Sequence, residues 1–294
     1  MLKKISIFTV GIISLAMASI LVKFCTDVPS VMIATYRLVI SSVVLIIIYK
    51  IKGFSFRDVG KRELLLSILS GFILALHFVS WFVSLKLTSV ASSVVLVTTN
   101  PLFVGLFSVI FLKEKLHKEI LIGIVLSIVG SIILAVGDSG LKGLSISDKG
   151  AVLGDILALL GAICASCYLL VGSKVREKLD IVTYVTIAYT ASAVFLLMFA
   201  LIQGLPFTGY KISSYISMIM LAIFPQLIGH TAVNWSLKHL KPSMVAIGIL
   251  GEPVGATILA YFILNEKIDI LKFLGICLIM ISIVVASKKG SKSS

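Results

Sequence analysis

A succession of long apolar runs, divided by short polar breaks, is the feature of this sequence that most restricts its fold. Each run has about 20 residues, the length at which a helix crosses the hydrocarbon of a bilayer. We place ten such spans, within a few residues at either end, at 5–24, 31–49, 64–84, 91–112, 120–136, 150–171, 181–202, 215–235, 243–264 and 270–286. The runs lack the alternating pattern of barrel strands, and helices are the other structure that satisfies its backbone inside a bilayer. The sequence therefore predicts an all-α integral membrane protein with ten transmembrane helices.

The composition agrees with a bilayer as the solvent. The chain is 59% hydrophobic and 13% charged, whereas a soluble domain is about 25% charged. Its net charge of +13 is scattered through the connections and is not gathered on one helix face, so we expect no nucleic-acid partner. We expect a multi-pass protein of the cell membrane, the inner or plasma membrane of a prokaryote, with the lipid bilayer as its first partner.

Lysine and arginine accumulate in alternate connections, which sets the predicted orientation. If the amino terminus is cytoplasmic, the outside connections carry only Lys86, Lys142, Lys149, Lys211, Lys267 and Lys272. Lys23 and Arg37 lie near the outer ends of their helices, and the rest of the 26 lysines and arginines lie inside. Because positive charge favours the cytoplasmic side, we predict that both termini are cytoplasmic. We expect the first span to remain in the membrane rather than to be cleaved as a signal peptide, because its apolar run continues to Phe24.

An internal repeat organises the ten spans. Ser84-Leu85-Lys86 recurs as Ser236-Leu237-Lys238, Glu114-Lys115 as Glu266-Lys267 and Gly123 as Gly275, and Pro101 recurs as Pro253 (253 − 101 = 152). Five spans per half is an odd number, so the second half must enter the membrane upside down, as in the inverted repeats of secondary transporters. We predict a 5+5 inverted repeat with a first five-helix unit at 1–137, an outer connecting loop at 138–149, a second unit at 150–287 and a basic cytoplasmic tail at 288–294.

With this repeat in view, the chain resembles the EamA-type permeases of the drug/metabolite transporter superfamily. The resemblance rests on the run TSVASS at 88–93, Pro101, Glu114, the run GEPV at 251–254, and Glu266. It covers both halves and implies a ten-helix transporter. It does not specify the substrate, because that superfamily handles amino acids, amines, nucleotide-linked sugars and drugs.

Two prolines lie near the middle of the fourth and ninth predicted spans, where a transport site is expected. Asn100 precedes Pro101 in the fourth span, and Glu252 precedes Pro253 at the equivalent place in the ninth. Each proline lacks an N–H and frees a carbonyl one turn earlier for a substrate or a water, and we also class Pro225 as a helix break or hinge. Glu252 is the only acidic residue at such depth, so we expect it to bind either a proton or a cationic group of the substrate. The structural alternative is a protonated acid bonded to a neighbouring helix, with Gly251 and Gly255 allowing close packing.

Two histidines add polar character to the interior. His77 and Trp81 lie four residues apart in the third span, and His230 and Asn234 lie four apart in the eighth, followed by Trp235. Spacing of four places each pair on one helix face. An imidazole facing lipid is costly, so these side chains either line a cavity or bond a neighbouring helix.

Opposite charges at similar depth suggest one further contact. Arg37 in the second span and Asp155 in the sixth both lie a turn or two inside the outer surface, so we predict that they pair, as a gate or as a static salt bridge. We also name Tyr168, Gln226 and Tyr261 as candidates for the cavity wall, although tyrosines near helix ends commonly belong to the interfacial belt.

The sequence carries no signature of a cofactor, a metal site or an enzyme. Cys164 and Cys167 form a CxxC with no second pair to complete a site. Motifs of zinc hydrolases, serine hydrolases and Walker A ATPases are missing, so a membrane-embedded enzyme is only a remote alternative and we expect energy to come from gradients.

The polar residues of the interior suggest the kind of solute. One acid, two histidines, an asparagine and several aromatics suit an amino acid or organic amine, whereas a polyphosphate would need clustered arginine or lysine. The sequence thus favours a secondary transporter, an exporter working by alternating access with protons as the candidate coupling ion. A passive facilitator or channel remains the alternative. A monomer suffices, and a homodimer is compatible.

Overall fold

The computed structural model describes residues 2–55, 59–88, 90–113, 115–139, 149–265 and 268–288, which fold into helices. The helices are α1 (Leu2–Lys23), α2 (Ser30–Ile51), α3 (Lys61–Leu87), α4 (Val90–Val97), α5 (Asn100–Leu112), α6 (Lys118–Ser139), α7 (Lys149–Val175), α8 (Ile181–Ile202), α9 (Ile212–Leu221), the π-helical segment η3 (Ala222–His230), α10 (Thr231–Ser236), α11 (Pro242–Ile249), α12 (Gly251–Leu264) and α13 (Ile270–Ser287). Ser89, Glu114 and Glu266 of the family resemblance lie outside the described residues, as do 140–148 of the predicted connecting loop and 289–294 of the predicted tail.

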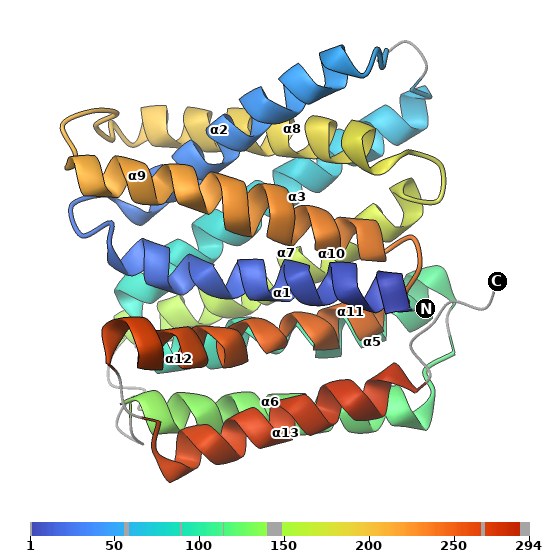
Figure 1. Ribbon diagram of the computed structural model, residues 1–294, viewed down its shortest axis with the longest axis vertical. Coiled ribbons are helices and arrows are strands. Elements are labelled where there is room, and N and C mark those ends of the chain that lie inside the picture. The colour runs from blue at the N-terminus through green and yellow to red at the C-terminus, as the bar shows by residue number, and fades with distance from the viewer. Residues whose placement is uncertain are drawn as a thin grey trace.

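The described residues form ten segments long and apolar enough to cross a membrane. Seven are single helices, while α4 with α5, α9 with η3 and α10, and α11 with α12 are spans built from consecutive pieces. In Figure 1 they run from side to side, across the long axis of the molecule, and are stacked one above another. The predicted all-α membrane fold with ten spans is therefore confirmed, and the protein is a multi-pass protein of the cell membrane.

The fourth and ninth spans are interrupted at equivalent places. Pro101 and Pro253 each lie in the first turn of a new helix, α5 and α12, where the missing proline N–H costs no hydrogen bond. Both second pieces also end alike, because Lys113 and Asn265 adopt left-handed backbone with φ of 53° and 56°. These two residues are again one repeat length apart, so the two spans share their start, their break and their end.

The eighth span contains a wide turn in place of a break. Pro225 lies inside η3, where the backbone follows a π-helix, and α10 continues directly from it. Proline cannot donate to the carbonyl four residues earlier, and a π-helical turn is one way for a helix to accommodate it. Pro225 therefore lies in a widened, continuous helix and not at a break, while its role as a hinge stays a prediction.

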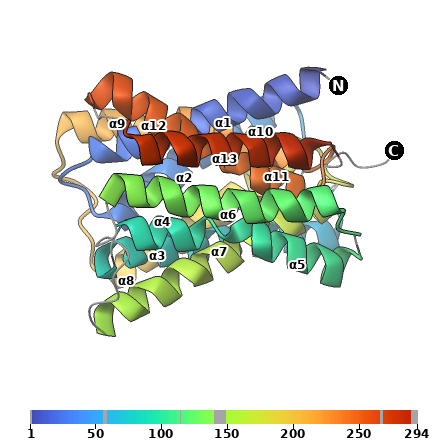
Figure 2. The same cartoon turned by 90° about the horizontal axis from the view of Figure 1, so that it is seen from below.

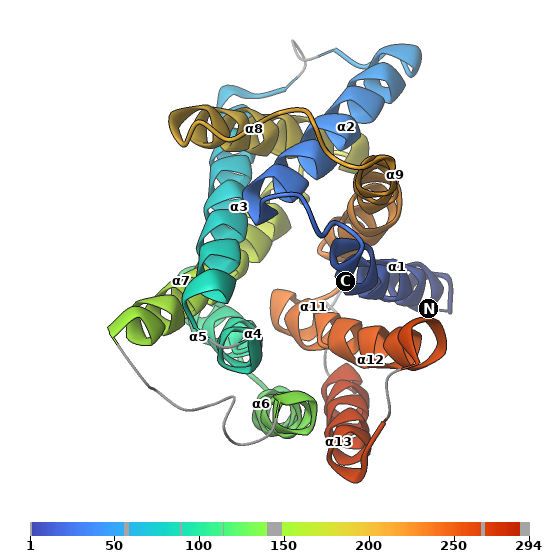
Figure 3. The same cartoon turned by 90° about the vertical axis from the view of Figure 1, so that its left-hand side faces the viewer.

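The last helices of the two halves, α6 and α13, pack against each other at one edge of the bundle (Figures 1 and 3). A methyl group placed on Gly123 would lie 3.2 Å from the carbonyl oxygen of Ser282, and one placed on Gly275 would lie 2.9 Å from that of Gly130. Gly275 is the repeat equivalent of Gly123, and Ser282 is that of Gly130. Each contact thus has a counterpart in which the two halves exchange roles, which is the signature of a two-fold axis.

The first and the last of the described helices, α1 and α13, have their outer ends on the same side of the bundle. The start of α1 and the end of α13 are on one side in two perpendicular views, as an even number of spans requires (Figures 1 and 2). Which side is cytoplasmic stays a prediction from the distribution of lysine and arginine.

Asp27, in the connection between α1 and α2, ties that connection to the start of α9. Its carboxylate accepts hydrogen bonds from the backbone amide of Lys211, at 2.7 Å, and from the hydroxyl of Ser214. These bonds, the one from Ser214 first, hold the pKa of Asp27 below its ordinary value of 3.8. The stabilisation is therefore complete at neutral pH and is lost as pH falls through the depressed pKa.

Replacing Asp27 by Asn is expected to lower the melting temperature at neutral pH, because the amide offers only one acceptor atom and no charge. The difference from the wild type should shrink once the pH falls below 3.8, where the native carboxylate also becomes protonated. Thermal unfolding in detergent across a pH series measures this. Equal melting temperatures at neutral pH would contradict the assignment.

Candidate functional site

Arg37 carries its charge into the interior of the bundle. It lies on α2, is 6% exposed, and donates from Nε to Oε1 of Gln226 at 2.7 Å. Its guanidinium also lies over the ring of Phe78, 5.2 Å from the centroid, at a cation–π distance. A charged side chain inside a membrane protein is costly and marks a functional region by default.

Arg37 does not pair with Asp155, contrary to the sequence prediction. Oδ1 of Asp155 accepts from the hydroxyl of Thr88 at 2.7 Å, and the two salt bridges found among the described residues do not include either side chain. Similar depth along the membrane normal was the basis of the prediction. Depth does not fix the direction in which a side chain leaves its helix.

Gln226 is brought to Arg37 by the π-helical turn of η3. The side chain is fully buried, and its amide nitrogen has no hydrogen-bond partner among the described residues. The sequence suggested Gln226 only as a cavity-wall residue. The one available signal was Pro225 immediately before it, because a proline inside a span distorts the helix that follows.

Asn234, on α10, is the centre of a second polar group. Its side-chain nitrogen lies 2.6 Å from the hydroxyl of Tyr168, 3.3 Å from that of Tyr189 and 2.8 Å from the carbonyl oxygen of His230. Its Oδ1 has no partner among the described residues. An amide nitrogen has two hydrogens for these three neighbours, so the group can rearrange and still stay bonded.

The two histidines differ in their surroundings. Nδ1 of His77 bonds the carbonyl oxygen of Gly161 on α7 at 2.9 Å, and its ring is nearly parallel to that of Trp81. The ring of His230 meets Phe78 edge to face at 6.2 Å. Phe78 and His230 are repeat equivalents, and equivalent residues touch only near the axis between the halves. His77 therefore bonds a neighbouring helix, while His230 lies near the centre of the molecule.

Asn100 and Glu252 lie at the breaks of the fourth and ninth spans. The backbone carbonyl of Asn100 accepts from the hydroxyl of Ser166 at 3.1 Å, whereas its Oδ1 has no partner in the described part of the chain. Glu252, in the first turn of α12, is half-buried and interacts electrostatically with Arg37. Within the described residues no hydrogen bond or salt bridge involves its carboxylate.

The glycines beside Glu252 pack against α1 and leave the carboxylate unbonded. A methyl group on Gly251 would meet Ile12 at 2.9 Å, and one on Gly255 would meet Ala16 at 2.7 Å. The close packing expected for these glycines is therefore present. The bonded, protonated acid of the structural alternative has no partner among the described residues.

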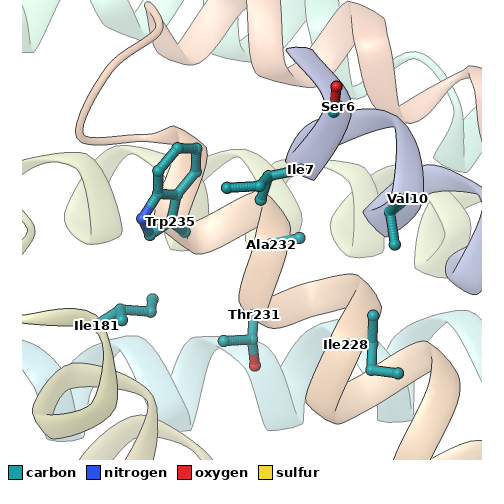
Figure 4. A pocket seen from close by; sticks show the side chains of 8 residues that line it. All are labelled: Ser6, Ile7, Val10, Ile181, Ile228, Thr231, Ala232 and Trp235. Carbon is teal, nitrogen blue, oxygen red and sulfur yellow. The ribbon is translucent and has the colours of Figure 1, made fainter. Parts of the chain in front are cut away.

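Trp235 does not join the polar group around Asn234. It lies in an apolar groove between α1, the start of α8 and the end of the eighth span (Figure 4). The groove has a volume of about 400 Å³ and is lined by Ser6, Ile7, Val10, Ile181, Ile228, Thr231, Ala232 and Trp235. Val10 and Ile228 are exposed, and an exposed apolar surface on a membrane protein contacts lipid. Tyr261 is 48% exposed on the far part of α12 and is also remote from the polar group.

The site thus consists of an arginine–glutamine pair, an asparagine–tyrosine group, two aromatic-flanked histidines and one carboxylate. Its polar groups are amides, hydroxyls, imidazoles, a guanidinium and a carboxylate. Among the described residues no group of three histidine, cysteine, aspartate or glutamate side chains is placed to hold a metal ion. Such an arrangement can hydrogen-bond a small organic solute and neutralise a charge on it.

The comparison with known families decides the identity. The model of the EamA-like transporter family matches residues 2–136 and again 152–288. The chain belongs to the EamA-like transporter family. An EamA-like transporter moves a small molecule across a bilayer, so the interior polar residues of this one are candidates for contact with its substrate.

Named relatives are transporters, and a solved structure shares the fold. The EamA-like chain is 26% identical over 246 residues to an uncharacterized transporter of Archaeoglobus fulgidus, covering 83% of this chain and 82% of that protein. It is 24% identical over 270 residues to the uncharacterized transporter YetK of Bacillus subtilis, covering 89% and 80%. One crystal structure superposes with a TM-score of 0.82 at 18% identity, over 98% of this chain and 97% of that one, which shows a shared fold.

Proposed function

We propose that this transporter is a proton-coupled exporter of a small metabolite with an amino group, an amino acid or an organic amine. The observation that supports the proposal most strongly is the half-buried carboxylate of Glu252, which has no bonded partner among the described residues and lies within electrostatic range of Arg37. A carboxylate that has no hydrogen bond or salt bridge inside a membrane protein is stabilised by binding a cationic group or a proton.

Alternating access is supported by the arrangement of the halves. We assign the first half to 1–137 and the second to 150–287, joined by the connection 138–149 and followed by the tail 288–294. Inverted halves can rock against each other around a fixed central site, and interrupted helices commonly form that site. One chain supplies both halves, so we propose that a monomer is the transporting unit.

The direction of substrate transport is inferred from competition between a proton and the substrate at the carboxylate of Glu252. If Glu252 holds either a proton or the ammonium group of the substrate, each cycle exchanges one for the other. The proton gradient across the membrane of a prokaryotic cell points inward, so this exchange moves the substrate outward. The coupling free energy is then the proton gradient, and no nucleotide is consumed.

Flux in proteoliposomes tests the function. Vesicles containing the purified protein, with an imposed pH gradient, are supplied with radiolabelled amino acids and amines, and uptake is followed over time at several pH values. We expect accumulation above the external concentration for at least one solute, and loss of that accumulation when a protonophore collapses the gradient. Empty vesicles are the control. Equilibration that ignores the gradient would favour the passive facilitator.

A further inference from the structure

The two pieces of the ninth span differ in how completely the protein covers them. In α11 every residue from Pro242 to Gly248 is buried, whereas in α12 only Val254 is buried among the residues from Gly251 to Thr257. Consecutive residues of a helix point about 100° apart, so each of these stretches faces every direction around its axis. Protein therefore surrounds α11 on all sides and covers α12 incompletely.

The fourth span shows the same contrast in the opposite order along the chain. In α5, Val104, Gly105 and Ser108 form a buried face, while Leu102 and Leu106 are exposed, as expected for a helix packed on one side. Residues 94–99, in α4 and the break after it, are all half-buried in every direction. We call the side of the bundle where α1 begins and α13 ends the terminal side. Figure 2 shows α5 and α11 toward the terminal side and α4 and α12 toward the opposite side.

The packing of these four pieces follows their burial. On the terminal side α11 packs against α5, α6 and α7, so the fourth and ninth spans meet there. The main neighbours of α4 are α3, α6 and α7, and those of α12 are α1, α11 and α13. One repeat length relates α4 to α11 and α5 to α12. The contact of α5 with α11 therefore has a counterpart between α12 and α4, which is not among the main contacts of the described residues.

Three further helical segments meet on the terminal side around Gly172, in the last turn of α7. A methyl group on Gly172 would lie 2.8 Å from the hydroxyl of Tyr184, on α8. It would also lie 3.1 Å from Leu237 and 3.5 Å from Oδ1 of Asn234, at the end of the eighth span. One turn earlier in α7, the hydroxyl of Tyr168 lies 2.6 Å from the side-chain nitrogen of Asn234. The absence of a side chain at Gly172 thus allows this close approach.

We infer that this structure is closed on the terminal side and open on the opposite side, and that Gly172, Tyr168 and Asn234 form the terminal gate. The inference rests on the alternating access of the proposed function and adds the direction of opening and the residues that hold it. In an inverted repeat, the other state is obtained when the halves exchange roles. In that state α4 packs against α12, α5 leaves α11, and the terminal gate is open.

Cysteine labelling tests the direction of opening. The four native cysteines are replaced by alanine, and membrane vesicles of each orientation are treated with a membrane-impermeant maleimide. Thr208→Cys and Glu177→Cys, at exposed positions of two connections, mark the opposite and the terminal side. We expect Ala256→Cys, which is half-buried one turn after Glu252, to react from the opposite side only. Ser108→Cys, which is 0% exposed on α5, should react from neither side.

Gly172→Ala tests the terminal gate. The added methyl group is expected to destabilise the closed state, in which Gly172 meets three other side chains, and so to populate the state that is open on the terminal side. Ser108→Cys should then react from that side about 5- to 100-fold faster, the change in population that overpacking of one state produces. Tyr168→Phe removes only a hydrogen bond and should give about a 2- to 10-fold increase. If Gly172→Ala does not yield monodisperse protein, Tyr168→Phe decides the question.

Two matched variants are the controls. Gly161→Ala changes another glycine of α7, where the new methyl group would lie 3.6 Å from Trp81, and Tyr261→Phe changes an exposed tyrosine of α12. Both should leave the labelling of Ser108→Cys unchanged.

Two results would overturn the inference. Labelling of Ala256→Cys from the terminal side would contradict the direction of opening. Unchanged labelling of Ser108→Cys in both Gly172→Ala and Tyr168→Phe would contradict the terminal gate. Labelling needs neither a substrate nor a proton gradient, so the expected labelling without gradient-driven flux would instead refute the proposed exporter and leave the terminal gate standing.

Discussion

Replacing Glu252 by Gln is expected to abolish accumulation against a gradient and to lower the initial flux about 10- to 100-fold, the range for losing a charge-assisted bond. Glutamine keeps the size of the side chain but cannot exchange a proton or carry a negative charge. Its effect therefore isolates the ionisable group from the packing around it. Flux in proteoliposomes at several pH values measures both quantities, and the dependence of flux on pH should flatten in the variant.

A surface carboxylate provides the control for this experiment. Glu177 lies just after α7, forms an exposed ion pair with Lys174 at 3.5 Å, and touches none of the polar interior. Glu177→Gln should transport like the wild type. If Glu252→Gln retained full transport with the same pH dependence, Glu252 would be neither the proton site nor the ammonium site, and the coupling mechanism proposed above would fail.

The second large effect is expected on stability, from Gly71→Ala in α3. A methyl group at this position would fall well inside contact distance of the carbonyl oxygen of Ala188 and 3.0 Å from the backbone nitrogen of Ser192, both on α8. Because these atoms are backbone, the helices themselves must separate. Overpacking of this kind costs about 1–3 kcal/mol, which corresponds to a loss of about 2–12 °C in melting temperature for a chain of this length.

A second helical glycine gives a close comparison. A methyl group on Gly161, in α7, would lie 3.6 Å from Trp81, an ordinary van der Waals distance. Gly161→Ala should therefore change the melting temperature by little. Size-exclusion profiles of both variants after heating supply the measurement. Equal stability of Gly71→Ala and the wild type would show that α3 and α8 can separate at no cost.

The positions of the helices could be predicted because bilayer thickness converts composition into length. A run of apolar residues long enough to cross must be a helix, since the backbone has no other partner there. The offset between Pro101 and Pro253 likewise predicted equivalent interruptions, because proline acts locally on its own helix. Rules that apply to one segment at a time therefore predicted the positions of the ten spans and the breaks in the fourth and ninth of them.

The contacts of the site could not be predicted in the same way. The position of Arg37 and Asp155 along their spans predicts their depth but not the rotation of α2 and α7 about their axes, so the predicted pairing of these two residues is wrong. Trp235 follows Asn234 directly, and a step of one residue turns a side chain by about 100° around a helix. Asn234 therefore faces the tyrosines of the interior, and Trp235 faces the apolar groove.

Gln226 shows a different limit of prediction from the sequence. Its approach to Arg37 depends on η3, and a π-helical turn changes the face of every residue that follows it. Proline in a helix can produce a kink, a break or a wide turn, and the choice depends on the neighbouring helices. A sequence read one span at a time contains no information about those neighbours.

The contact between α6 and α13 restricts how the molecule can move. Glycines allow the backbones of these helices to touch at two equivalent places, and helices in such contact cannot slide lengthwise without first coming apart. We therefore expect α6 and α13 to keep their contact throughout the transport cycle. Opening to either side of the bilayer would then be a rotation of the remaining helices about this contact, with the largest displacements at the opposite edge, where α2 and α8 lie.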